Sequence, residues 1–235
     1  MPSSTNRAWR PLAAVLSCII LVWLSILYID RPASTWSHEH LGRPGFLNEF
    51  TQLVDPLPIA AVLGVAGAAA FGGWRFGERG RTFISACLAI LVSEETKDQL
   101  KMLFGRPWPE AWTSRTPSWI GNHAYGFHFL HGSSALGSFP SGHMAQAAAI
   151  AAVVWLRMPR IRWLGVVLAT LVAAALWGAD YHFVADIIAG AFLGATCGTF
   201  VVAVVCGKQA HQTETMRHGP ARIANALPNP SNGRR

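Results

Sequence analysis

Six long apolar blocks set the strongest limit on how this chain can fold. They cover residues 11–29, 57–74, 82–104, 141–156, 163–179 and 187–206. A helix needs about 20 predominantly apolar residues to cross the hydrocarbon core of a bilayer. Charged residues make up only 13% of the chain, against roughly 25% in an average soluble domain. We therefore predict an all-α membrane protein, a bundle of six transmembrane helices.

The blocks also define the organisation of the chain. Residues 1–10 are a short N-terminal segment, 11–206 the membrane domain, with a long loop at 105–139, and 207–235 a polar, basic tail that we expect to be disordered. The first block is long, and no small-residue cleavage site follows it, so an uncleaved first span is favoured over a signal peptide.

Arginine clusters indicate the orientation of the bundle. They flank the N-terminus, the second and fourth connections and the tail, and such clusters are typical of the cytoplasmic side. Both termini are therefore expected in the cytoplasm, and the first, third and fifth connections outside. The net charge of +7 is explained by these topology signals, so no nucleic-acid partner is expected.

Two kinds of bound group are not expected from the composition. The four cysteines, Cys18, Cys87, Cys197 and Cys206, lie in or beside apolar blocks, where free thiols usually pack as small apolar side chains. Their spacing matches no metal site. We expect neither a metal nor another cofactor.

The fourth block begins at Phe139-Pro140-Ser141-Gly142-His143. Ser141 is a good N-cap, and the free N–H groups of a helix start bind anions. Gly142 lets an anion approach the backbone, and His143 can supply a proton. The alternative is an ordinary loop end with a surface histidine.

The end of the third block carries charged residues at helical spacing: Glu94, Lys97, Asp98 and Lys101. Ionisable groups inside a span usually face the bundle interior. We favour an anion-binding role for Lys101. For Glu94 and Asp98 we favour structural pairing with lysine.

Between the fifth and sixth blocks, His182 and Asp186 are four residues apart, a spacing at which they can hydrogen-bond on a helix. A carboxylate orients a histidine as base or nucleophile; the alternative is a pair that only caps the sixth span. Together with Lys101 and His143, these residues form a plausible phosphate site without metal ligands. One histidine attacks phosphorus, the other protonates the leaving oxygen, and Lys101 and the N–H groups stabilise the charge.

Over roughly residues 57–206 the chain resembles the type 2 phosphatidic acid phosphatases (PAP2), which share a fold with vanadium haloperoxidases. The family's Pro-Ser-Gly-His motif is complete at Pro140–His143, and the His and Asp of its third motif match His182 and Asp186. Lys101 matches the lysine of the first motif. Trp108 and Leu176 stand where the family has phosphate-binding arginines, and Arg106 lies two residues before Trp108.

The resemblance implies roles for these residues. His182 is expected to form a phosphohistidine, Asp186 to orient it, and His143 to act as acid and then base. Lys101, Ser141, Gly142 and Arg106 are expected to hold the phosphate, with Arg115, His128 or His131 as further sources of positive charge.

The function that follows is a lipid phosphatase of the bacterial inner (plasma) membrane, acting on a lipid phosphate or diphosphate at the periplasmic face. A lipid phosphotransferase using the same site and an inactive membrane scaffold are the alternatives. The tryptophans of the long loop are expected to anchor it at the membrane interface, or else to form a substrate lid. Nothing in the sequence indicates an oligomeric state.

Overall fold

The regular structure of the chain is helical. The computed structural model describes residues 5–72, 77–111 and 116–224, and in these ranges it has no strand beyond two isolated β-bridges. The long helices of these ranges are α1 (Thr5–Leu24), α4 (Leu57–Gly72), α5 (Glu78–Phe104), α7 (Gly142–Arg157), α8 (Arg162–Gly178) and α9 (Val184–Ala224). Each of the six predicted blocks corresponds to one of them, although residues 73 and 74 lie outside the described ranges. The all-α prediction is confirmed.

Three stretches are long and apolar enough to cross a membrane by themselves: Trp9–Leu41, Gly45–Phe71 and Val184–Gly207. The other helices fall outside this group for identifiable reasons. The second half of α5 is charged, and α7 and α8 are only 16 and 17 residues long. The structure thus has the helices of a membrane protein, and the count of six spans remains a prediction.

The first connection is more helical than expected. We predicted a mixed loop over residues 30–56, but α1 continues through a π-helical turn, η1 (Ser25–Ile29), into α2 (Asp30–Leu41), and α3 (Gly45–Gln52) follows. The π turn contains residue 28, whose carbonyl would accept the usual α-helical bond from residue 32, but Pro32 has no N–H to donate. Helix α2 ends where Gly42 adopts a left-handed conformation with φ 61°, a common helix C-cap.

The end of the chain is also more helical than expected. Helix α9 runs to Ala224, so the helix continues into the segment 207–224 of the predicted tail. Residues 208–218 contain neither glycine nor proline, and most of them are good helix formers. Residues 225–235 lie outside the described part of the chain.

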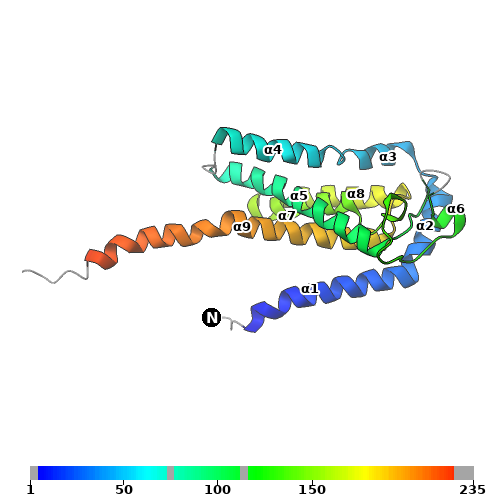
Figure 1. The fold of residues 1–235 in the computed structure, drawn as a ribbon, viewed down its shortest axis with the longest axis horizontal. Coiled ribbons are helices and arrows are strands. Elements are labelled where there is room, and N and C mark those ends of the chain that lie inside the picture. The colour runs from blue at the N-terminus through cyan, green and yellow to red at the C-terminus, as the bar shows by residue number, and fades with distance from the viewer. Residues whose placement is uncertain (1–4, 73–76, 112–115, 225–235) are drawn as a thin grey trace, which may run out of the picture.

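The long loop, residues 105–139, covers one end of the bundle, near α2. It contains α6 (Trp119–Asn122) and the 3₁₀ turn η2 (Ser134–Leu136), and isolated bridges join Arg106 to Gly137 and Trp108 to Ser118. Figure 1 shows α2 and α6 at this end, whereas the start of α1 and the end of α9 point toward the other. Trp112 and Arg115 lie outside the described residues.

Helix α7 is central and packs against α5, α8 and α9. Its closest approach is to α9, where glycines recur at 190, 194 and 198. A Cβ on Gly194 would overlap the carbonyl oxygen of Ala145, and one on Gly198 would lie 2.6 Å from that of Ala149. Small residues at this spacing let membrane helices pack backbone to backbone. This contact fixes the start of α7 against the start of α9, where the predicted site residues lie.

Candidate active site

The predicted site residues gather at the end of the bundle that the long loop covers. Lys101 comes from the end of α5, His143 from the start of α7, and His182 from the turn between α8 and α9. The rings of His143 and His182 lie with centroids 6.4 Å apart. The ring of Trp108 is 5.3 Å from that of His182, and the Lys101 ammonium lies 5.5 Å from the Trp108 ring. Residues as far apart in the chain as Lys101 and His182 thus share one site.

Ser141 caps α7 as predicted. Its Oγ accepts a hydrogen bond from the Met144 N–H at 3.4 Å, and its own N–H donates to the Asp186 carbonyl at 3.1 Å. The next N–H groups belong to the first helical turn, which has no acceptors within the helix. Gly142 also serves packing, because a Cβ there would come within 2.7 Å of Lys97 Cδ.

His182 is buried next to a carboxylate. Its side chain is 1% exposed, and its Nδ1 lies 3.6 Å from Asp186 Oδ2, just beyond hydrogen-bond distance. Burial lowers the pKa of His182 to about 4, although Asp186 opposes the shift. The imidazole is therefore neutral at pH 7, the form that can act as a nucleophile. Because Nδ1 is the nitrogen on the Asp186 side, Nε2 is the nitrogen that can attack.

Asp186 is held from several directions. Its Oδ1 accepts from Arg106 at 2.5 Å, and its Oδ2 accepts from Ser138 Oγ at 2.5 Å and from the Phe183 N–H at 3.0 Å. Such bonds stabilise the ionised carboxylate and fix its orientation toward His182.

Arg106 lies in a different place from the one expected of a phosphate ligand. Its side chain has no exposed surface, and its two terminal nitrogens bind Asp186 and, at 2.6 Å, Asp30. Its guanidinium also lies 4.5 Å from the centre of the Phe183 ring. With both terminal nitrogens bound to carboxylates, Arg106 is placed to position Asp186 and not to meet a phosphate.

Sequence reasoning missed Asp30. Its carboxylate is fully buried and accepts hydrogen bonds from Arg106, from Ser25 Oγ at 2.8 Å, from the Ala185 N–H at 2.9 Å and from the Tyr125 hydroxyl at 3.3 Å. It thereby joins the first helix to the start of α9. The sequence signal was a single aspartate directly after the first apolar block. Because residues 30–56 were expected to form a loop, this aspartate was not assigned to the site.

Asp55 was also missed as a site residue. It precedes α4, and its Oδ1 lies 2.8 Å from His143 Nε2. This bond orients the His143 ring directly, whereas Asp186 lies 3.6 Å from the His182 ring nitrogen. The signal was again an acid at the border of an apolar block.

Positive charge in the site is limited. Lys97 is paired with Glu94 at 2.7 Å and with Asp98 at 3.2 Å, in line with the structural role favoured for these acids. Within the described ranges Lys101 forms no ion pair, so its charge is available to an anion. Leu176, at a family arginine position, is fully buried, and its carbonyl accepts from the N–H groups of Tyr181 and His182.

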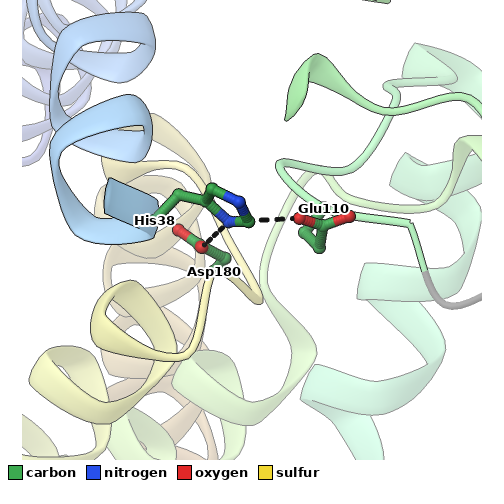
Figure 2. Close-up of side chains that lie close together, drawn as sticks. All are labelled: His38, Glu110 and Asp180. Carbon is green, nitrogen blue, oxygen red and sulfur yellow. Dashed lines mark hydrogen bonds and ion pairs between the residues drawn. The ribbon is translucent and has the colours of Figure 1, made fainter. Parts of the chain in front are cut away.

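A second polar cluster, which we call the His38 cluster, lies beside this site. It consists of His38, Glu110 and Asp180, whose candidate ligand atoms all lie within 4.8 Å of one another (Figure 2). No sequence pattern predicted that these residues lie close together, because they come from three distant segments of the chain.

The fold is that of a known class of membrane proteins. The chain is similar to the structure described as the first transmembrane PAP2 type phosphatidylglycerolphosphate phosphatase from Bacillus subtilis. The TM-score is 0.50 at 19% identity, over 83% of this chain and 96% of that one. The PAP2 superfamily model matches residues 82–209, more than half of the chain. The chain therefore belongs to the PAP2 superfamily. No curated protein sequence matches it.

Proposed function

We propose that this protein is a lipid phosphatase that hydrolyses a lipid phosphate or diphosphate through a phosphohistidine on His182. The observation that carries the proposal is the pair of facing histidines. His182 and His143 lie with ring centroids 6.4 Å apart, and each has its own carboxylate, Asp186 or Asp55. Two oriented histidines on either side of a phosphoryl group can serve as nucleophile and acid.

The first step forms the phosphohistidine. Nε2 of His182 attacks phosphorus, and the bond from phosphorus to the leaving oxygen breaks. His143 donates a proton to that oxygen, so that the lipid leaves as an alcohol or, from a diphosphate, as a monophosphate. Asp186 keeps the proton on Nδ1 of His182, which stabilises the positive charge that develops on the imidazole.

The second step releases phosphate. A water molecule attacks phosphorus while His143 takes one of its protons, and the bond between nitrogen and phosphorus breaks. Lys101 and the N–H groups at the start of α7 stabilise the charged oxygens in both steps, as preorganised donors do in other phosphoryl-transfer sites. Ser141 and Gly142 hold this helix start in place.

The site is proposed to face the periplasm of a bacterial inner membrane. The arginine clusters all lie in segments assigned to the other side by the positive-inside rule. The substrate would then reach the site from the outer leaflet. Membrane lipids are its expected surroundings.

The test is phosphate release from isoprenyl diphosphate and phosphatidate by the purified protein. The wild type should release phosphate, and His182→Ala should reduce the rate by at least about 10³-fold because it removes the nucleophile. His123→Asn is the matched control: this histidine is exposed, lies at the same end of the molecule and has φ 57°, which asparagine also tolerates. Equal phosphate release by the wild type and His182→Ala would overturn the assignment.

A phosphotransferase is the second candidate, and the identity of residues 108 and 176 favours it. With Trp108 and Leu176 in place of arginines, the site lacks two positive charges. It therefore matches a diester monoanion better than a phosphomonoester dianion. An alcohol would then replace water in the second step. Transfer of a labelled headgroup to a lipid acceptor without free phosphate would identify this activity, and free phosphate as the sole labelled product would exclude it.

If neither product forms with any lipid, the scaffold alternative can be tested in cells. A scaffold should tolerate His143→Ala and His182→Ala without a change in phenotype. A loss of phenotype in well-expressed variants would reject it.

A further inference from the structure

We propose that His38, Glu110 and Asp180 bind one divalent transition-metal ion, with Zn²⁺ as the best match. His38 comes from α2, Glu110 from the long loop, and Asp180 from the turn between α8 and α9. Figure 2 shows the imidazole of His38 between the two carboxylates. The site is separate from the proposed phosphate chemistry and does not depend on it.

The distances fit ligands around a common ion. His38 Nδ1 lies 3.1 Å from Asp180 Oδ2 and 3.2 Å from Glu110 Oε2. Two ligand bonds of about 2.1 Å place their outer atoms about 3.0 Å apart at a right angle and about 3.4 Å apart at a tetrahedral angle. Both distances from His38 fall within this range, and the two carboxylate oxygens lie within 4.8 Å of each other.

Hydrogen bonding alone leaves this cluster incompletely satisfied. Both carboxylates converge on one nitrogen, and a neutral imidazole can offer only one proton there. Asp180 has a fully buried side chain, yet its Oδ1 has no hydrogen-bond partner among the described residues. Unsatisfied buried oxygens are costly, and a metal ion would satisfy both carboxylates at once.

The charge of the cluster also favours a cation. With the imidazole of His38 neutral, the form that binds a metal, the two carboxylates of the cluster carry two negative charges and the three side chains themselves supply no positive one. The left-handed backbone of Asp180, with φ 52°, is unusual for a residue other than glycine and marks a position held by its surroundings.

The two helical segments that carry His38 and lead to Asp180 are held together before any ion binds. The rings of Trp36 and Trp177 are stacked with centroids 5.7 Å apart, Ser37 Oγ donates to the Trp177 carbonyl at 3.1 Å, and Trp177 Nε1 donates to the Ala33 carbonyl at 3.2 Å. These contacts fix α2 against the end of α8, on either side of the cluster. A preformed site avoids the cost of ordering its ligands on binding.

The donor set selects the kind of ion. One imidazole nitrogen with two carboxylate oxygens suits Zn²⁺ and, less strongly, Mn²⁺, whereas Mg²⁺ and Ca²⁺ prefer oxygen alone. The His38 side chain is 39% exposed, so the ion can enter from solvent and complete its coordination with water. A bound ion would fasten α2 and the long loop to the turn that leads into His182.

The experiment is metal binding to the purified full-length protein in detergent, after treatment with a chelator. Zn²⁺ titrated by calorimetry should bind at one equivalent per chain, elemental analysis should find the same ratio after desalting, and Zn²⁺ should raise the unfolding temperature. Glu110→Gln and His38→Ala should each weaken binding by at least about tenfold and lose the thermal shift. Glu110→Gln is nearly isosteric, so it keeps the test valid if His38→Ala does not fold.

His40→Ala is the matched control, because His40 lies on the same helix with its Nδ1 on the Trp36 carbonyl. It should bind Zn²⁺ as the wild type does. Absence of a stoichiometric site in the wild type, or equal loss of binding in His40→Ala, would overturn the proposal. Binding of Zn²⁺ that survives both His38→Ala and Glu110→Gln would place the metal elsewhere and also overturn it.

Discussion

Replacing Arg106 tests the proposed role of the buried network that positions Asp186. In the wild type, one guanidinium joins two carboxylates at 2.5 and 2.6 Å, and all three side chains are fully buried. Arg106→Gln leaves Asp30 and Asp186 as two buried negative charges without a cation. Removing one partner of a buried ion pair costs about 3–5 kcal/mol, so we expect a loss of that size in the free energy of unfolding.

Asp30→Asn should be milder. It leaves the pair of Arg106 and Asp186 intact, and the asparagine oxygen can still accept hydrogen bonds, so a loss of about 1–2 kcal/mol is expected. In the double variant only one carboxylate remains unpaired. Its loss should therefore be smaller than the sum of the two single losses, as expected for residues in one network.

The assay is equilibrium unfolding in mixed detergent micelles, followed by helical circular dichroism, with phosphate release measured on the folded fraction. Arg31→Gln is the control: Arg31 is the exposed neighbour of Asp30 and lies over the rings of Trp119 and Tyr125, contacts worth about 1 kcal/mol or less. If Arg106→Gln is no less stable than Arg31→Gln, the network does not hold the site together. If Arg106→Gln folds normally but loses phosphate affinity alone, Arg106 is a substrate ligand after all.

Three further predictions concern other parts of the molecule. Asp55→Asn should lower kcat by about tenfold, a fraction of the 10²–10⁴ that a general acid contributes, and an unchanged kcat would show that Asp55 does not orient His143. Gly194→Leu should destabilise the protein by about 1–3 kcal/mol through overpacking against α7. Gly67→Leu is the control and should not destabilise the protein, because a Cβ at Gly67 meets no atom within 4 Å. If the two variants have equal unfolding temperatures, the close contact of α7 and α9 is contradicted. Because the nucleophile must be neutral, His182 should set the acid limb of the pH profile, and activity should be lost as the pH falls through about 4. A profile of kcat/KM, measured with a chelator present, in which activity is instead lost as the pH falls through about 6.5 would contradict the buried environment of His182.

The helices could be predicted from the sequence because apolar length alone indicates them. The candidate site residues Lys101, His143 and His182 could also be identified from the sequence, since they lie at the borders of apolar blocks and match a known motif pattern. Their roles remain predictions.

What could not be predicted depends on contacts between distant segments. Asp30 reaches Ala185 across 155 positions, and His38 reaches Asp180 across 142. No local pattern encodes such pairs. The partners of Arg106 are hidden for a related reason: its position in the sequence suggested a phosphate ligand, whereas the two carboxylates that it binds come from α2 and α9.

The π-helical turn η1 affects how far α1 can rotate or shift relative to Asp30. Asp30 is bonded to Arg106, Tyr125 and Ala185, which follow it in the chain, and to Ser25 Oγ inside the turn, whereas α1 precedes all of these residues. A π turn accommodates one more residue than an α turn, so deleting one residue from 25–29 would rotate all of α1 by about 100° and shift it by about 1.5 Å. That change would move the membrane-facing side of α1 and displace Ser25 Oγ from Asp30, while the bonds of Asp30 to Arg106, Tyr125 and Ala185 would keep their geometry. The residues before the turn can thus adapt to lipid, whereas Asp30, directly after it, must stay in register with the turn that carries His182.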